Sequence, residues 1–325
     1  MEKENKLRLL YMAKVIYERT DEHTTLTGPE IIQILKEEYD ISTHRQTLAA
    51  DIELLRGFGM DIKTIKSNPN QYQLASRMFT GPELKLLIDA VASSKFISAS
   101  KSRELIEKLS SLSSRNQAEE FKRNIDVEGR IRTDNEHTHL IIDAINAAIN
   151  DNKKISYLYT RYEGQKRKHV SNGGEPYVFS PHRLVWNGDY YYMIGWSDKH
   201  ESVVNFRIDR VKDVPKILDD KAHKMPKGFK LAKYLNTTFR MFNSDALDVE
   251  LECDMGTLDS VTDRFGNKIP LEFDDAGHYI TRVTVAVNHV FYSWVFGFGG
   301  KVKILGPEEV VDGYKEMVRK AFETL

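Results

Sequence analysis

The chain has 325 residues, of which 41% are hydrophobic and 29% are charged, a composition typical of a folded protein of two or three domains and not of a disordered one. The formal net charge of −1 excludes a protein that binds polyanions over its whole surface, and the single cysteine, Cys253, excludes a disulfide framework or a cysteine-based zinc site. No apolar run is long enough to cross a bilayer, and the first residues lack the pattern of a signal peptide. We therefore expect a cytoplasmic protein without a membrane partner.

Residues 1–76 have the pattern of a winged helix-turn-helix domain. Apolar residues recur every three or four positions in three successive stretches, which predicts three short helices. Thr27-Gly28-Pro29-Glu30 has the capping pattern of a helix start, and Ser42 is predicted to cap the third helix. Two alternating runs, 61–66 and 71–74, then predict a hairpin. Three helices followed by a hairpin are the elements of a winged helix-turn-helix.

The apolar spacing and capping pattern of residues 77–136 predict a helical connector. Thr80-Gly81-Pro82-Glu83 repeats the capping pattern, and Leu84, Leu87, Ile88 and Val91 follow at helical spacing. Serines are dense beyond this helix, so we expect polar joints between the helices.

The pattern of residues 137–216 predicts a leading helix followed by a small β-barrel. The helical pattern covers 137–150, and from Lys154 the apolar period changes to two. Asn187-Gly188, between two alternating runs, is the strongest hairpin signal in the chain. Several short strands joined by tight turns are typical of a small barrel.

The remaining residues predict a linker over 217–244 and a third domain over 245–325. The linker is rich in lysine and has no clear period, whereas strand and helix patterns alternate from residue 245 onward in the order of a split βαβ layer. The predicted fold class is therefore multi-domain α+β, with a winged helix-turn-helix, a helical connector, a small Sm/SH3-like barrel and a C-terminal ferredoxin-like α+β domain.

Charge is distributed unevenly among these parts. Residues 1–76 hold 10 basic and 12 acidic side chains, and residues 77–150 hold 11 of each. Residues 151–216 hold 12 basic and 8 acidic side chains, whereas residues 217–325 hold 14 and 17. The excess of positive charge therefore belongs to the predicted barrel and not to the predicted DNA-binding domain.

The start of the third helix supplies the candidate DNA contacts, because this part of a helix-turn-helix enters the major groove. Gln46 can bind an adenine edge, Arg45 can bind a guanine edge or a phosphate, and lysines on the predicted wing can hold the backbone. The candidate DNA-binding residues are Thr43, His44, Arg45, Gln46, Thr47, Lys63 and Lys66.

Residues 155–214 resemble the WYL domain, a small Sm/SH3-like barrel of bacterial transcription regulators. The resemblance rests on Tyr191-Tyr192-Met193 in place of the family's namesake tripeptide, on Phe206-Arg207-Ile208-Asp209-Arg210-Val211 and on Ser180-Pro181-His182-Arg183-Leu184-Val185. The tail from residue 245 is similar to the WYL C-terminal extension. The chain departs from its relatives at Gln46 and Ala50, where they often carry arginine.

The resemblance implies a ligand-controlled transcription factor, usually a homodimer, that binds a double-stranded DNA operator. It also implies that the barrel senses an anionic effector such as a nucleotide or a single-stranded nucleic-acid fragment. The pocket residues that it implies are Ser180, His182, Tyr192, Arg207 and Arg210.

The residues by themselves leave an alternative open at this pocket. Arg207 or Arg210 can pair with Asp209 or Asp213, and the nearby tyrosines can fill a barrel core. Two arginines three positions apart on a regular strand point to opposite faces, so both can serve one pocket only if the strand ends or bulges between them.

No catalytic triad, paired acid or metal-ligand spacing is found, so we expect no catalytic residues, no metal and no cofactor. Cys253 is predicted to be a core thiol. Two rival functions remain: a protein-interaction module without sequence-specific DNA binding, and an enzyme acting on nucleotides with His182 as base.

Overall fold

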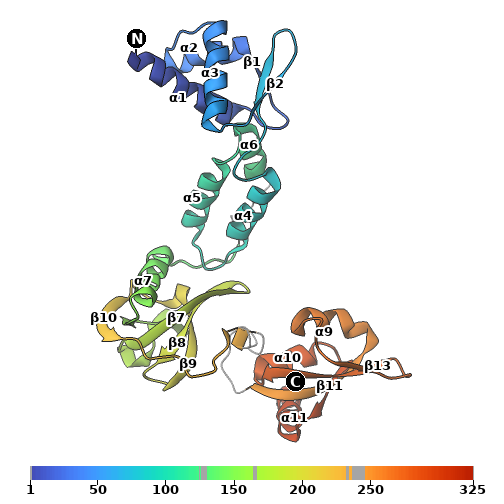
Figure 1. Ribbon diagram of the computed structural model, residues 1–325. Coiled ribbons are helices and arrows are strands. Elements are labelled where there is room, and N and C mark those ends of the chain that lie inside the picture. The colour runs from blue at the N-terminus through green and yellow to red at the C-terminus, as the bar shows by residue number, and fades with distance from the viewer. Residues whose placement is uncertain are drawn as a thin grey trace. The chain divides into compact units, whose positions relative to one another are not determined.

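The computed structural model describes residues 2–123, 125, 130–163, 167–231, 234–235 and 246–324 (Figure 1). The chain divides into two compact units, Met1–Thr138 and His139–Leu325. The first unit contains an N-terminal lobe (residues 2–76) and a helical lobe (77–136). The second contains a β-rich domain (139–221) and a C-terminal domain (246–324).

The N-terminal lobe contains the three predicted helices and the predicted hairpin, and a short additional strand. Thr27 caps the second helix through a capping box with Glu30, as the sequence predicts. The three strands are antiparallel in the order β1-β3-β2, and one apolar core joins them to the helices. The elements are α1 (Glu2–Arg19), β1 (Leu26–Thr27), α2 (Gly28–Tyr39), α3 (Arg45–Phe58), β2 (Ile62–Ile65) and β3 (Gln71–Leu74).

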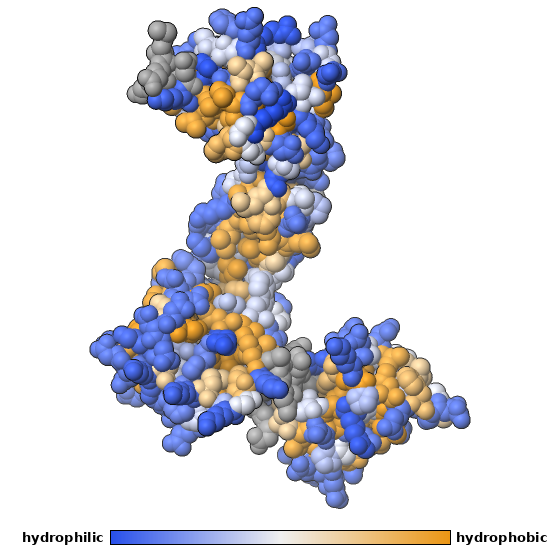
Figure 2. All heavy atoms as spheres, in the orientation of Figure 1, coloured by the Kyte–Doolittle hydropathy of each residue, from blue (hydrophilic) through white to orange (hydrophobic). Residues whose placement is uncertain are grey.

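The helical lobe packs three helices around a small core of its own. Thr80 and Glu83 form a second capping box at the start of the first of these helices. Hydrophobic side chains are visible on the surface of this lobe in Figure 2, and Leu86 is 71% exposed. The helices are α4 (Gly81–Ser93), α5 (Ala99–Ser110) and α6 (Arg115–Arg123).

Buried polar groups join the helical lobe to the N-terminal lobe. Asp21 is 1% exposed, and its carboxylate accepts hydrogen bonds from two backbone N–H groups of its own turn and from the hydroxyl of Ser114. Burial alone would raise the pKa of Asp21, but these hydrogen bonds lower it overall. Arg77 donates to the carbonyl oxygens of Tyr17 and Thr20 and lies over the Tyr17 ring. The two lobes therefore form one compact unit.

The β-rich domain begins with a helix and continues as antiparallel strands. Its main sheet has five strands in the order β10-β4-β7-β8-β9, and β5 and β6 form a separate hairpin. Asn187 and Tyr190 close the predicted tight hairpin, with Gly188 at a φ of 56°. The elements are α7 (Thr138–Asn150), β4 (Lys153–Tyr157), β5 (Thr160–Glu163), β6 (Arg167–Val170), η1 (Asn172–Gly174), β7 (Tyr177–Asn187), β8 (Tyr190–Ser197), β9 (Ser202–Arg207), η2 (Ile208–Arg210) and β10 (Lys216–Lys221).

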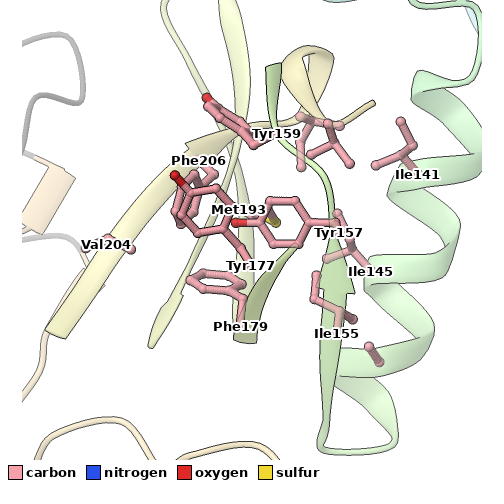
Figure 3. Packing of buried hydrophobic residues seen from close by; sticks show 13 residues of the cluster. Ile141, Ile145, Ile155, Tyr157, Tyr159, Tyr177, Phe179, Met193, Val204 and Phe206 are labelled. Atoms are coloured by element: carbon pink, nitrogen blue, oxygen red, sulfur yellow. The ribbon is translucent and has the colours of Figure 1, made fainter. Parts of the chain in front are cut away.

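The core of this domain is rich in aromatic rings (Figure 3). Tyr157, Tyr159, Tyr177 and Phe206 contact one another mostly edge to face, with ring centroids 5.2 to 6.4 Å apart. The helix α7 adds Ile141 and Ile145 to this cluster. An isolated bridge between Tyr159 and Val211 brings the ends of β4 and β9 together. The sheet is therefore folded around the core, as a small barrel requires.

The sequence-based linker starts too early, because residues 216–221 form the edge strand β10. Only Ile217 of this strand packs on the core, and its other side chains are mostly charged. Charged side chains are common on edge strands because they discourage pairing with another chain. They also replace the apolar residues whose alternation would indicate a strand in the sequence. Of the predicted linker, residues 232, 233 and 236–244 lie outside the described residues.

The C-terminal domain packs helices against a four-stranded antiparallel sheet in the order β12-β13-β11-β14. Apart from the short η3, the elements from β11 to β14 follow the order strand, helix, strand, strand, helix, strand, which is that of the split βαβ unit. Cys253 is fully buried, and burial raises the pKa of its thiol to about 11, so the predicted core thiol is confirmed. The elements are β11 (Ala246–Asp254), η3 (Met255–Thr257), α9 (Leu258–Phe265), β12 (Leu271–Phe273), β13 (His278–Ala286), α10 (His289–Phe296), β14 (Val302–Gly306) and α11 (Glu308–Glu323).

Candidate functional site

The third helix begins two residues later than Ser42 predicts. Its N-cap is His44, whose side chain makes no capping hydrogen bond. Thr43 precedes the helix and is only 9% exposed, and its hydroxyl has no hydrogen-bond partner among the described residues. Thr43 is therefore not accessible to a molecule that approaches the start of the helix. His44, Arg45 and Gln46 are exposed and Thr47 is half-buried.

The outward face of α3 carries few charges. Its buried side is formed by Leu48, Asp51, Ile52 and Leu55. At 100° per residue, the line directly opposite this side runs through Gln46, Ala50, Glu53 and Gly57. In the first half of this line, Gln46 presents an amide and Ala50 presents a methyl group. The charge of Glu53, which follows, is paired with Arg56. The outward line therefore favours base edges over phosphates.

The hairpin beside α3 presents two lysines. Lys63 of β2 and Lys66 in the following turn are exposed, and neither forms an ion pair with a described residue. Arg56 fixes the hairpin to α3, because its Nε donates to the carbonyl of Ile62 (2.7 Å) and its Nη2 to the hydroxyl of Thr64 (2.6 Å). Arg45, Lys63 and Lys66 thus provide three exposed cations held by a defined backbone.

A buried ion pair that the sequence analysis did not predict holds α3 against α1. Arg8 donates through Nε to Asp51 Oδ2 (2.6 Å) and through Nη2 to Asp51 Oδ1 (3.2 Å), and the Asp51 side chain is 5% exposed. The hydrogen bond to Asp51 raises the pKa of Arg8 against the opposing effect of burial. The signal in the sequence is an acidic residue inside the apolar stripe of the third helix.

In the second unit, the strand register assigns the predicted ligand residues to the two faces of the main sheet. Tyr192 pairs with Arg207, and Ser180 pairs with Trp196. Paired residues of an antiparallel sheet share a face, and alternate residues of one strand do too. Ser180, Tyr192 and Arg207 therefore lie on one face, opposite the aromatic core. We call it the outer face, and it comprises Ser180, Arg183, Val185, Tyr190, Tyr192, Ile194, Trp196, Val203, Asn205 and Arg207.

Arg207 is held in place by an ion pair on this face. Its Nε and Nη2 donate to the two carboxylate oxygens of Asp209, at 3.1 and 2.7 Å. Its guanidinium carbon lies 3.2 Å from the centre of the Tyr190 ring. The structure therefore contains the pairing of Arg207 with Asp209 that the sequence left open as an alternative. Two N–H groups are used by the carboxylate, so the remaining donors of the guanidinium fork are still available to an anion.

Arg210 lies apart from this ion pair. β9 ends at Arg207, and η2 follows, so the strand ends between the two arginines. Arg210 is half-buried, and its guanidinium has no hydrogen bond or ion pair with a described residue. Burial raises the pKa of Tyr159, and the positive charge of Arg210 opposes this rise. The backbone N–H of Arg207 donates to the Tyr159 hydroxyl (3.3 Å).

Ser180 and His182 bind a backbone segment beyond β10. Ser180 Oγ, which is fully buried, accepts the N–H of His223 (2.8 Å). His182 Nε2 lies 2.7 Å from the carbonyl oxygen of His223, which can only accept, so Nε2 carries the proton. Burial lowers the pKa of His182, so the ring stays neutral at pH values at which an exposed histidine would be protonated.

A close backbone approach places His182 in this position. The register of β7 against β8 shifts between Pro181 and Arg183, so His182 is the extra residue of a β-bulge. Gly195 lies opposite the bulge, where a Cβ atom would be 2.0 Å from the carbonyl oxygen of Ser180. Only glycine fits there without a shift of backbone.

Tyr192 is 6% exposed, and burial raises its pKa to about 12. The phenol therefore stays protonated at neutral pH and can donate a hydrogen bond. Ser180, Tyr192 and Arg207 are thus brought to one face with His182 at its edge, whereas Arg210 lies at the end of the neighbouring strand.

No helix in the described parts of the chain is both long and apolar enough to span a membrane. In the same parts, no group of three or more His, Cys, Asp or Glu side chains is placed to hold a metal ion.

These parts together define a multi-domain α+β protein. The WYL domain matches residues 141–215, and the WCX domain matches residues 245–322. The chain therefore contains a WYL domain followed by a WCX domain. No curated protein matches the sequence.

Two solved structures are similar to the chain at low sequence identity. Proteasome accessory factor B/C (PafBC) of Arthrobacter aurescens is 17% identical over 94% of this chain, with a TM-score of 0.31. The chain covers 46% of the length of that protein. A CRISPR Cas-related protein is 14% identical over 90% of this chain and 76% of its own, with a TM-score of 0.39.

Proposed function

We propose that the protein is a DNA-binding transcriptional regulator that responds to an anionic, nucleotide-like or single-stranded nucleic-acid ligand at its WYL domain. The observation that carries this proposal is the outer face. Ser180, Tyr192 and Arg207 come from three separate strands and share this face with the rings of Tyr190 and Trp196. A guanidinium fork suits a phosphate, and aromatic rings suit the stacking of bases.

In this proposal, residues 2–76 act as a winged helix-turn-helix with α3 in the major groove. Arg45 and Gln46, with His44 and Thr47 beside them, contact the operator, and Lys63 and Lys66 bind its phosphates. The support is that Arg45, Gln46 and both lysines are exposed and make no hydrogen bond or ion pair with a described residue. The active form is a homodimer, which places two copies of α3 over two half-sites.

Replacing Arg45 and Gln46 together by alanine should abolish sequence preference. Each base contact contributes about 1–3 kcal/mol, so we expect the loss of two contacts to lower affinity for the protein's own promoter fragment about thirtyfold or more. Affinity for a scrambled duplex should change much less. Fluorescence anisotropy with both duplexes at one salt concentration measures the ratio.

Two single variants serve as controls for this experiment. Lys108→Ala removes an exposed charge from α5 and should leave both affinities unchanged. Lys63→Ala should weaken binding to both duplexes equally, because a phosphate contact carries no sequence information. If the Arg45→Ala, Gln46→Ala variant keeps its preference for the promoter fragment, α3 is not the reading element.

Replacing Arg210 by glutamine should weaken ligand binding without breaking an existing ion pair. Arg207→Ala is a poorer test, because it also breaks the ion pair with the Asp209 carboxylate, which is only 8% exposed. A charged hydrogen bond contributes about 1.5–3 kcal/mol, so affinity for a single-stranded oligonucleotide should fall about tenfold or more. Arg161→Gln on β5 removes the same charge from an exposed position of the same domain. An equal loss in both variants would mean a general charge effect and no specific contact.

A specific observation favours a second candidate function, that of a protein-interaction module. Leu54 and Phe58 lie one turn apart on α3 and are 60% and 86% exposed. Exposed apolar side chains of this size mark protein contacts more often than DNA contacts. A salt titration separates the two functions, since binding to DNA weakens steeply as salt rises whereas apolar protein contacts do not. For the nucleotide-acting enzyme, His182 Nε2 is the group to test, and it donates to a backbone carbonyl in this structure.

A further inference from the structure

Part of the outer face is covered by the chain itself. The residues that follow β10, namely 222–231 with Tyr234 and Leu235, are called the cover segment here. Its Phe229, Leu231, Tyr234 and Leu235 pack against Tyr192 and Ile194 in one apolar cluster. Tyr192, one of the predicted ligand residues, is therefore buried by chain that the sequence analysis assigned to a linker.

Directed contacts hold the cover segment at its two ends. At one end, Ser180 and His182 bind the backbone of His223, and the His223 ring lies parallel to the Trp196 ring with centroids 4.1 Å apart. At the other end, Asn205 Nδ2 donates to the hydroxyl of Tyr234 (2.8 Å). The outer face thus offers one flat ring for stacking and one amide for an edge hydrogen bond.

These two features are those that a protein uses to bind a nucleobase. Stacking on an aromatic ring binds any base through its π-face, and an amide side chain recognises the polar edge. His223 and Tyr234 are planar rings that occupy these two positions. The cover segment therefore takes the place that a base-containing ligand would take on the outer face.

The cover segment is held to the sheet by few backbone bonds. Beyond Ala222, its own backbone hydrogen bonds run from Phe229 to Pro226 and from Tyr234 to Lys230, inside the segment, in the part that the structure describes. Segments with few bonds to the rest of the fold open at low free-energy cost. Residues 222–231 contain three lysines and no acidic residue, and this positive charge attracts an anion toward this face.

We propose that the cover segment is an internal occupant of the outer face, and that a base-containing anion displaces it and then uses Trp196 and Asn205 as its own contacts. This inference rests on the proposed function and names the ring-binding positions and the regulation of that site. Opening the segment costs free energy, so only a fraction of the molecules can bind the ligand. The apparent affinity is the affinity of the open form multiplied by this fraction.

Variants of the full chain that loosen the segment should bind ligand more tightly. The probe is a fluorescein-labelled single-stranded oligonucleotide of about ten nucleotides, within the usual length of such sites. Tyr234→Ala should tighten binding about tenfold, because it raises the open fraction, and Tyr234→Phe should have a smaller effect. Lys227→Gln, at an exposed position of the same segment, should not tighten binding.

Substitutions in the sheet should lower the affinity for the oligonucleotide instead of raising it. Trp196→Leu also loosens the segment, but it removes the stacking ring, so oligonucleotide affinity should fall about tenfold. Hydrogen exchange of the free and bound protein gives an independent readout. The His223 amide should exchange faster when the oligonucleotide is bound, although a ligand ordinarily slows exchange where it binds.

The possible results separate this inference from the function on which it rests. Equal affinity for the parent, Tyr234→Ala and Trp196→Leu proteins, with slower exchange at His223, would overturn the cover segment as a competitor and leave a nucleic-acid ligand standing. An absence of binding in every protein, Tyr234→Ala included, would overturn the proposed ligand class and this inference with it.

Discussion

Gly195→Ala is expected to unfold the WYL domain or to lower its free energy of unfolding by about 3 kcal/mol or more. The added Cβ would lie 2.0 Å from the Ser180 carbonyl oxygen, 2.9 Å from Phe179 Cζ and 3.0 Å from Pro181 Cα. Two of these atoms belong to the backbone of β7, and Phe179 is a fully buried core ring. None of them can move without disturbing the bulge at His182, so the strain spreads into the sheet.

Hydrogen exchange of β7 and β8 in increasing urea measures this effect locally in a chain with several domains. Gly57→Ala is the matched control, because a Cβ at Gly57 meets nothing within 4 Å and the residue is helical. Alanine there should stabilise α3 by about 0.5–1 kcal/mol. Unchanged protection of β7 and β8 in the Gly195→Ala protein would contradict the close approach.

Asp51→Ala is expected to lower the free energy of unfolding of the first unit by about 3 kcal/mol. The substitution removes the carboxylate that accepts the hydrogen bonds of Arg8 Nε and Nη2, and the Arg8 side chain is only 16% exposed. It also removes the contact that fixes α3 against α1, so operator affinity should fall even though Asp51 lies on the buried side of α3. The measurement is the urea dependence of hydrogen exchange in α1 and α3.

The double variant Arg8→Met, Asp51→Leu distinguishes an unpaired charge from a lost contact. A buried ion pair replaced by apolar side chains of similar size is often as stable as the original. We therefore expect the double variant to recover most of the stability that Asp51→Ala loses. An equally unstable double variant would show that the geometry of the ion pair itself holds the two helices.

Local signals in the sequence predicted much of the fold. The capping boxes at Thr27 and Thr80 and the hairpin at Asn187-Gly188 are confirmed, because each depends on residues within a few positions of one another. The start of α3 was predicted at Ser42 and is wrong by two residues. Ser42 has the right side chain for a cap, but the backbone enters the helix at His44.

Features that depend on distant residues were missed. Asp21 and Ser114 are 93 positions apart, and Arg8 and Asp51 are 43 apart, so no periodicity connects them. β10 was missed because most of its side chains are charged. The cover segment was assigned to a linker for a related reason, since its lysines obscure the few apolar side chains that pack on Tyr192 and Ile194.

The candidate site was predicted in part. The family motifs pointed to Ser180, Tyr192 and Arg207, and the register of the sheet brings all three to one face. The motifs gave no information on what those residues contact in the folded chain. The pairing of Arg207 with Asp209 is a local contact that the sequence left open as an alternative, whereas the His223 backbone at Ser180 depends on tertiary packing.

The buried contact between Asp21 and Ser114 has a consequence for how the protein can be divided. A fragment ending at residue 76 would lack Ser114 and Arg77, leaving the Asp21 carboxylate and the carbonyl oxygens of Tyr17 and Thr20 without these partners. Arg132, which donates to the carbonyl of Ser94 (2.8 Å) and to the hydroxyl of Ser102 (2.7 Å), extends the same cooperative block toward residue 138. The smallest fragment that retains these partners is therefore the whole first unit, in which α1, α2 and α3 are expected to unfold together with the helices that follow them.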